Sequence, residues 1–144
     1  LVDGLRHDPR CAPGVTLRAE VEAADGVLLH ADREQLRQVW LNLAANAFEA
    51  VGPRGTLVVR ALPGADGRLT VEFEDDGPGI AAEDLPRVGE PFFTTKHGGT
   101  GLGLAIATRI VERHGGTLSI DSAPGRGTRV RVLLPDAQQA LAAA

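Results

Sequence analysis

The stretch Gly98-Gly-Thr-Gly-Leu-Gly103 is the most informative part of the sequence, because it brings four glycines to the start of a helix. Apolar residues at helical spacing follow from Leu102 to His114, and Gly115-Gly116 marks the end of that helix. A glycine-rich helix N-terminus directs backbone N–H groups and the positive end of the helix dipole outward. No Gly-Lys-Ser/Thr follows, so this is not a Walker A loop, and a long loop precedes it rather than the strand of a dinucleotide fingerprint. The stretch therefore predicts a phosphate-binding site.

Length and composition exclude several classes of protein. The 144 residues suit one domain of ordinary size with its own core. The single Cys11 cannot form an internal disulfide, and no Cys/His cluster suggests zinc. The formal net charge of −4 and the 3% aromatic content argue against general nucleic-acid binding. No signal peptide or run of ~18 apolar residues is present, so we expect this chain to make no membrane contact.

Alternating and helical patterns divide the rest of the chain into short elements. Strands are expected at Val15–Val21, Gly26–His30, Thr56–Leu62, Arg68–Glu74, Thr117–Asp121 and Thr128–Leu134. A helix is expected to begin at Asp32, with Gln35 three residues later, and to end near Gly52-Pro53. This order indicates an α/β fold, specifically an α+β two-layer sandwich. We expect the domain to span residues 15–135, with a remnant of an upstream linker or helix at 1–14 and a tail at 136–144.

Asn42, Asn46 and Glu49 lie on one face of the expected helix, because they occupy positions i, i+4 and i+7. Asparagine is a poor helix former, so two on one stripe need a reason. A carboxamide oxygen is a hard ligand suited to Mg²⁺, which takes few protein ligands besides phosphate oxygens. This cluster alone is equally compatible with a solvated polar face.

Two loops carry further groups that suit a ligand. The first, Asp75-Asp76-Gly77-Pro78-Gly79, follows a strand and would let backbone approach a ligand closely, although a plain acidic turn would look the same. The second runs from Glu90 to Lys96 and contains two of the four phenylalanines. Its phenylalanines would anchor the loop and leave Thr94, Thr95 and Lys96 to contact anionic oxygen. The same two phenylalanines are also compatible with a small satellite core under a long loop.

Together and in order, these motifs resemble the sequence boxes of the GHKL ATPases. The N, G1, F, G2 and final glycine boxes match Asn42-Leu-x-x-Asn46-Ala, Asp76-Gly-Pro-Gly79, Pro91-Phe-Phe-Thr-Thr-Lys96, Gly99-Thr-Gly-Leu-Gly-Leu104 and Gly125-Arg-Gly-Thr128. The F and G2 boxes are most similar to those of bacterial sensor histidine kinases, particularly the nitrogen-regulator-like group. The resemblance covers about Val15–Leu134, and five boxes in order are specific where each alone is weak.

The resemblance implies the Bergerat fold, a mixed sheet of about five strands backed by three helices, which binds ATP or ADP with Mg²⁺. It implies that Asp76 binds the adenine amino group, that Asn46 ligates the metal, and that Phe92 and Phe93 hinge and anchor a lid, roughly Ile80–Thr100. Nucleotide contacts are expected at Asn42, Asn46, Asp76, Gly77, Gly79, Ile80, Phe92, Phe93, Thr94, Thr95, Lys96, Gly99, Thr100, Gly101, Leu102, Gly103, Leu104 and Thr128. Asn42, Asn46 and Lys96 are the candidate catalytic residues, Lys96 on charge and position alone.

The sequence departs from the family pattern at two points. Many relatives carry Lys or Arg three residues after the metal-binding Asn, where this chain has Glu49, so Lys96 or an arginine would balance the phosphate charge. None of the four histidines stands in the setting of a phosphorylated histidine, which sensor kinases carry on a separate helical dimerisation domain. We therefore expect a fragment that binds Mg-ATP or ADP, does not autophosphorylate, and is monomeric. In the parent, a response regulator would act downstream.

The sequence is also compatible with other functions. A protein-serine kinase of the anti-sigma-factor type shares the fold and needs no appended domain. A hydrolase like gyrase is less favoured, because those enzymes activate water with a Glu in the place of Asn42. A non-catalytic nucleotide-binding module and a pure dimerisation scaffold are also compatible. In each case the expected location is the cytoplasm, or the cytosolic side of a membrane-anchored sensor.

Overall fold

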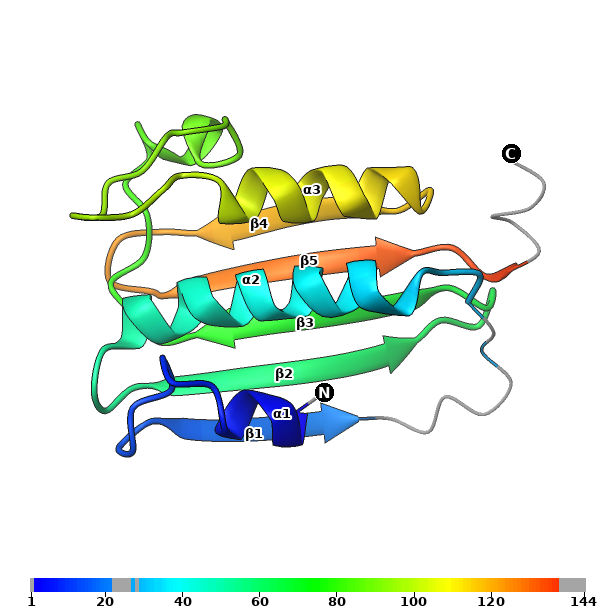
Figure 1. The fold of residues 1–144 in the computed structure, drawn as a ribbon, viewed down its shortest axis with the longest axis horizontal. Coiled ribbons are helices and arrows are strands. Elements are labelled where there is room, and N and C mark those ends of the chain that lie inside the picture. The colour runs from blue at the N-terminus through cyan, green and yellow to red at the C-terminus, as the bar shows by residue number, and fades with distance from the viewer. Residues whose placement is uncertain (1, 22–26, 28, 138–144) are drawn as a thin grey trace.

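The computed structural model describes residues 2–21, 27 and 29–137, which form one five-stranded sheet covered on one face by helices (Figure 1). The helices are α1 (Val2–Arg6), α2 (Arg33–Val51) and α3 (Gly103–Arg113), with a short 3₁₀ helix, η1, at Leu85–Arg87. The strands are β1 (Thr16–Val21), β2 (Thr56–Pro63), β3 (Leu69–Asp75), β4 (Thr117–Ser122) and β5 (Thr128–Leu134). The sheet order is β1-β2-β3-β5-β4, with β1 parallel to β2 and every other pair antiparallel. The expected mixed sheet backed by three helices is confirmed.

Helix α2 begins and ends where the sequence predicts. The Asp32 carboxylate caps the helix by accepting a hydrogen bond from the Gln35 backbone N–H at 2.9 Å. Gly52 stops it with φ of 64°, a conformation that glycine adopts without steric cost. Its apolar stripe is buried against the sheet, and its polar stripe with the two asparagines is left for the site.

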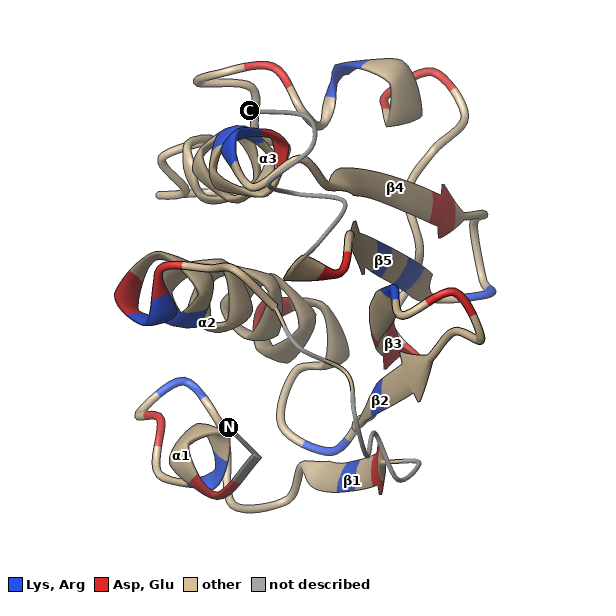
Figure 2. Cartoon of the chain, turned by 90° about the vertical axis from the view of Figure 1, so that its right-hand side faces the viewer, with Lys and Arg blue, Asp and Glu red and all other residues tan. Residues whose placement is uncertain are grey.

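The core lies between the helices and the sheet, and Figure 2 shows all three helices on one side of the strands. Trp40 of α2 stacks on Phe73 of β3 with ring centroids 6.0 Å apart, which joins the two layers at the middle of the sheet. Strand side chains alternate between faces, so Phe73 and Asp75 point to the helix side, and Glu72 and Glu74 point away. On that outer face, arginines of β2 and β5 pair with both glutamates.

The two ends of the chain and one expected strand need comment. The segment before β1 carries α1, and Leu5 of that helix is fully buried in the core. The strand expected at 26–30 is not observed at Val27 or from Leu29 to His30, and the rest of that range lies outside the described residues. Most of the expected tail, 138–144, also lies outside them. No helix in the described ranges is long and apolar enough to cross a membrane.

Candidate functional site

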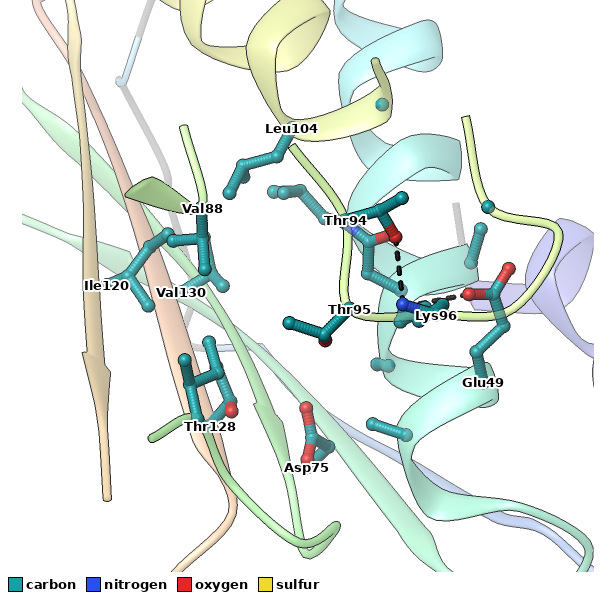
Figure 3. Close-up of a pocket in the computed structure, with 18 of the residues that line it drawn as sticks. Glu49, Asp75, Val88, Thr94, Thr95, Lys96, Leu104, Ile120, Thr128 and Val130 are labelled. Carbon is teal, nitrogen blue, oxygen red and sulfur yellow. Dashed lines mark hydrogen bonds and ion pairs between the residues drawn. The ribbon is translucent and has the colours of Figure 1, made fainter. Parts of the chain in front are cut away.

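A cavity of about 580 Å³ lies between the sheet, α2, the N-terminus of α3 and the loop 80–101, which we call the lid (Figure 3). The sheet side is formed by Phe73, Asp75, Ile120, Thr128 and Val130. The α2 side presents the polar stripe of that helix, namely Asn42, Asn46, Glu49 and Ala50. One wall is thus strand, one is helix, and the third is irregular chain.

Asp75, the last residue of β3, is the buried acid of the cavity. It is 8% exposed, and its Oδ1 accepts a hydrogen bond from the Gly77 N–H at 2.9 Å. Burial raises the pKa of this carboxyl, and the backbone N–H groups of Gly77 and Thr128 offset part of that effect. A carboxylate held in this way at an inner wall can accept a hydrogen bond from a ligand amine.

Asp76 does not reach the cavity, contrary to the role that the resemblance implied for it. Its Oδ1 accepts a hydrogen bond from the Thr56 backbone N–H at 2.7 Å, on the exposed side of the turn. The physical reason is strand alternation, since the residue after Asp75 must leave the face that Phe73 and Asp75 share. The acid that faces the cavity is therefore one position earlier than the sequence prediction.

Ser122, at the end of β4, was not singled out from the sequence, yet it joins three segments around the cavity. Its hydroxyl donates to the Gly127 carbonyl at 2.8 Å and lies 2.8 Å from the Thr128 hydroxyl. It also accepts a hydrogen bond from the Ile80 N–H at 2.9 Å, which fixes the start of the lid to the sheet. No motif in the sequence marked this serine.

The α2 wall carries two amides in different states. The Asn42 Nδ2 donates to the Gly103 carbonyl at 3.2 Å, so α2 is tied to the first turn of α3. The Asn46 carboxamide lines the cavity and makes no hydrogen bond to any described residue. An unengaged amide oxygen in the cavity fits Mg²⁺, whose ligands are hard oxygens.

Glu49 and Lys96 meet at the mouth of the cavity, where Figure 3 shows a dashed line between them. The Glu49 Oε2 lies 2.7 Å from the Lys96 Nζ, and the two side chains are 49% and 40% exposed. The positive charge of Lys96 is thus paired with Glu49, the residue that stands where many relatives carry Lys or Arg. An ion pair this exposed contributes little to stability, which leaves Lys96 able to exchange partners.

The start of α3 has no side-chain cap, so its first backbone N–H groups lack an intrahelical partner, and Gly103 and Leu104 of this turn line the cavity. Gly101 precedes it with φ of 69°, and a Cβ there would meet the carbonyl oxygens of Phe92 and Phe93 at 2.7 Å. Gly103 differs, because a Cβ there would make only ordinary contact with Asn42. Uncapped N–H groups at a helix start bind anions, as the opening glycine stretch predicted.

The two lid phenylalanines have opposite environments. Phe93 lines the cavity, and the Arg87 guanidinium lies over its ring, 4.3 Å from the centroid. Phe92 is 75% exposed and has φ of 66°, a left-handed conformation that is uncommon for a bulky residue. Phe93 thus faces the cavity and contacts Arg87 within the lid, whereas the Phe92 side chain is exposed.

The structure brings most of the expected residues to one cavity. Those that line it are Asn42, Asn46, Gly79, Ile80, Phe93, Thr94, Thr95, Lys96, Gly99, Thr100, Gly101, Gly103, Leu104 and Thr128. Those that do not are Asp76, Gly77, Phe92 and Leu102. Gly77 acts on the site through Asp75, and Leu102 is the N-cap position of α3. Arg10, from the segment between α1 and β1, also lines the cavity and was not expected there.

Comparison with known proteins gives a consistent result. Residues 31–138 match the family described as "Histidine kinase-, DNA gyrase B-, and HSP90-like ATPase". The sensor histidine kinase ZraS of Klebsiella oxytoca is 46% identical over 107 residues, 74% of this chain and 23% of that protein. Sporulation kinase C of Bacillus subtilis is 36% identical over 84% of this chain and 28% of its own length. The chain thus spans about a quarter of these curated relatives.

Solved structures agree with the sequence matches. The nucleotide-free catalytic domain of the histidine kinase ThkA has a TM-score of 0.77 at 30% identity, over 88% of this chain and 82% of that one. Full-length ShkA, solved in complex with AMPPNP, has a TM-score of 0.80 at 32% identity, over 94% of this chain and 28% of that one. The five-stranded domain with its cavity therefore belongs to the histidine kinase-, DNA gyrase B- and HSP90-like ATPase family, and its relatives there include sensor histidine kinases.

Proposed function

We propose that this chain is the catalytic part of a sensor histidine kinase, which binds Mg-ATP and donates the γ-phosphoryl group to a histidine on a separate domain. The proposal rests on one observation, that the two ends of a single cavity differ in chemistry. The buried Asp75 carboxylate at one end suits an exocyclic amine. The uncapped N-terminus of α3 beside Asn42 at the other end suits phosphate.

Each wall has its own part in this mechanism. Asp75, rather than Asp76, accepts a hydrogen bond from the adenine amino group, and the N–H of Gly77 holds its carboxylate in place. The backbone of Gly101 and Gly103 contacts the phosphates. Asn46 would hold Mg²⁺ through its amide oxygen, and the ion when bound neutralises charge on the phosphate oxygens. The protein's contribution is mostly position and charge.

The phosphoryl transfer itself needs a group from outside the described cavity. A histidine nitrogen forms a bond to the γ-phosphorus, the bond from that phosphorus to the bridging oxygen breaks, and ADP leaves. We therefore expect no label on this chain after incubation with γ-labelled ATP. Addition of the parent's histidine-bearing domain should give an acid-labile label on that domain. Stable acid-labile label on the isolated chain would contradict the proposal, and so would label on serine.

The metal assignment is tested at Asn46. Asn46→Ala should weaken Mg-dependent ATP binding by roughly 1–3 kcal/mol, the usual range for loss of such a polar contact. Gln38→Ala is the matched control, because Gln38 is an exposed residue of the same helix that does not line the cavity. Calorimetry with and without Mg²⁺ separates the metal contribution from the rest. Equal ATP affinity in wild type and Asn46→Ala would remove Asn46 from the site.

The proposed partners follow from the same mechanism. They are the histidine-bearing dimerisation domain of the parent kinase and a response regulator that takes the phosphoryl group downstream. The proposed location is the cytoplasm, where ATP is available, and the isolated chain is proposed to be a monomer. Light scattering on the isolated chain checks the last point, and a dimer mass would contradict it. A serine acceptor is not favoured, because the relatives found are named as histidine kinases and sporulation kinases.

A further inference from the structure

Arg10 lies in the short segment between α1 and β1, yet its side chain lines the same cavity as Asn46 and Lys96. This segment is held firmly for a chain without regular structure. The Cys11 N–H donates to the Asp8 carbonyl at 2.9 Å, and the Val15 N–H donates to the Ala12 carbonyl at 3.0 Å. Leu5, just before it, is fully buried in the core. Arg10 is therefore a fixed part of the cavity rim.

Asp8 sets the direction of the Arg10 guanidinium by a two-point contact. The Arg10 Nε donates to the Asp8 Oδ1 at 2.8 Å, and the Nη2 donates to the Oδ2 at 2.7 Å. The Asp8 side chain is 7% exposed, whereas the Arg10 side chain is 48% exposed. The contact uses one edge of the planar group, and no described residue accepts a hydrogen bond from its Nη1. One nitrogen of a positioned guanidinium is thus available to a ligand.

The charges that line the cavity favour a phosphate-binding role for Arg10. Among the described residues, Arg10 and Lys96 are the only basic side chains that line it, against the carboxylates of Glu49, Asp75 and Asp84. Lys96 is already paired with Glu49 at 2.7 Å. The hydrogen bond to Asp8 raises the pKa of Arg10, and the negative charge of Glu49 acts in the same direction. A polyphosphate entering this cavity therefore meets a second cation beside Glu49.

We propose that Arg10 is a further nucleotide contact, and that its guanidinium binds phosphate oxygens from the Glu49 side of the cavity. Asp8 acts through it as a positioning residue. This inference rests on the proposed function, because it needs a phosphate ligand in this cavity. It also makes the segment that precedes β1 part of the nucleotide site. Occupancy of the site would then hold that segment in place, in addition to the lid.

Calorimetry with Mg-ATP, Mg-ADP and adenosine tests the assignment. Arg10→Ala should weaken binding of both nucleotides by about tenfold, the lower end for a charge-assisted hydrogen bond, and should leave adenosine binding unchanged. Arg10→Lys should recover part of the loss, because it keeps the charge without the planar fork. Arg54→Ala is the matched control, since Arg54 is exposed nearby and does not line the cavity. It should bind like wild type.

The outcomes separate this inference from the function on which it rests. If wild type binds no nucleotide, the proposed function fails. If wild type binds and Arg10→Ala binds equally well, or loses adenosine by the same factor, the Arg10 contact is overturned. Hydrogen exchange on wild type decides the matter even if the variant misfolds. Mg-ADP should slow the amides of residues 10–12, and unchanged exchange there with slowed exchange in the lid would also overturn it.

Discussion

The cavity joins two regions built on opposite physical principles, the sheet wall and the lid. Asp75 and Thr128 are paired across β3 and β5, at the end of a continuous ladder of strand pairs. From residue 91 to residue 100 of the lid, every residue except Phe93 is exposed. The sheet wall holds a buried acid in one place, and the lid offers charge on a loop that few contacts restrain. Under the proposed function, the rigid wall would recognise the base and the adaptable lid would contact the phosphates.

The largest expected effect lies at Gly127, directly before Thr128 of the sheet wall. Gly127 has φ of 71°, and a Cβ there would overlap the Asp75 backbone carbonyl. Gly127→Ala should therefore lower the free energy of unfolding by about 3 kcal/mol or more, through strain and displaced backbone. Urea denaturation gives the value.

Gly125→Ala is the control for that measurement. Gly125 has φ of 77°, but a Cβ there would meet nothing within 4 Å. Only the left-handed backbone is then unfavourable, at about 1 kcal/mol. Equal losses in the two variants would mean that the sheet wall tolerates displacement, and the contrast with the lid would fail.

The next effect concerns which acid recognises the base. Asp75→Asn should weaken ATP binding by roughly 2 kcal/mol, because the buried acceptor loses its charge toward the adenine amine. Asp76→Asn should bind like wild type, since Asp76 faces Thr56 outside the cavity and an amide oxygen can still accept from that N–H. The reverse pattern would restore the prediction made from the motif.

A smaller effect follows from the raised pKa of Asp75. Burial lets the folded carboxyl bind a proton more tightly than the carboxyl of the unfolded chain, which titrates with the ordinary aspartate pKa of 3.8. Between the ordinary pKa and the raised one the folded state holds more protons, so this group's contribution to stability falls as pH rises through that window. The free energy of unfolding of wild type, relative to that of Asp75→Asn, should therefore increase as pH is lowered through the same window. Parallel pH profiles would contradict burial of the charge.

The fold was largely predictable from the sequence, whereas the motif did not identify which of two adjacent aspartates faces the cavity. Periodicity and glycine stops located α2, α3 and the four C-terminal strands. The alternation of Val71, Phe73 and Asp75 indicates that Asp75 shares the buried face, whereas the motif spacing points to Asp76. Strand parity is the stronger physical constraint, because a shift of one residue reverses the face.

Other contributions to the site had no local signal. Ser122 matters through hydrogen bonds to Ile80 and Gly127, residues brought together by the sheet order rather than by spacing. Arg10 reaches the cavity because the segment before β1 folds back toward the end of α2, where Gly14 lies against Pro53. The exposure of Phe92 depends on a left-handed backbone that composition does not predict for phenylalanine.

The smallest expected effect belongs to the lid, at the Glu49–Lys96 ion pair. Because both side chains are substantially exposed, Lys96→Ala and Glu49→Gln should each change the free energy of unfolding by at most about 0.5 kcal/mol. Their effects on ligand binding should have opposite signs. Lys96→Ala should weaken ATP binding more than ADP binding, because it removes a cation from the phosphate end. Glu49→Gln should strengthen ATP binding severalfold, since it releases Lys96 and removes a competing negative charge.

Calorimetry on both variants and on the double variant tests whether the pair acts as one unit. If Lys96 reaches phosphate only by leaving Glu49, adding Glu49→Gln to Lys96→Ala should raise ATP affinity only by the effect of removing the Glu49 charge. A stability loss well above 1 kcal/mol in either single variant would mean that the pair holds the lid shut as a structural contact. The lid would then be a second rigid wall, and nucleotide entry would have to displace it as a body.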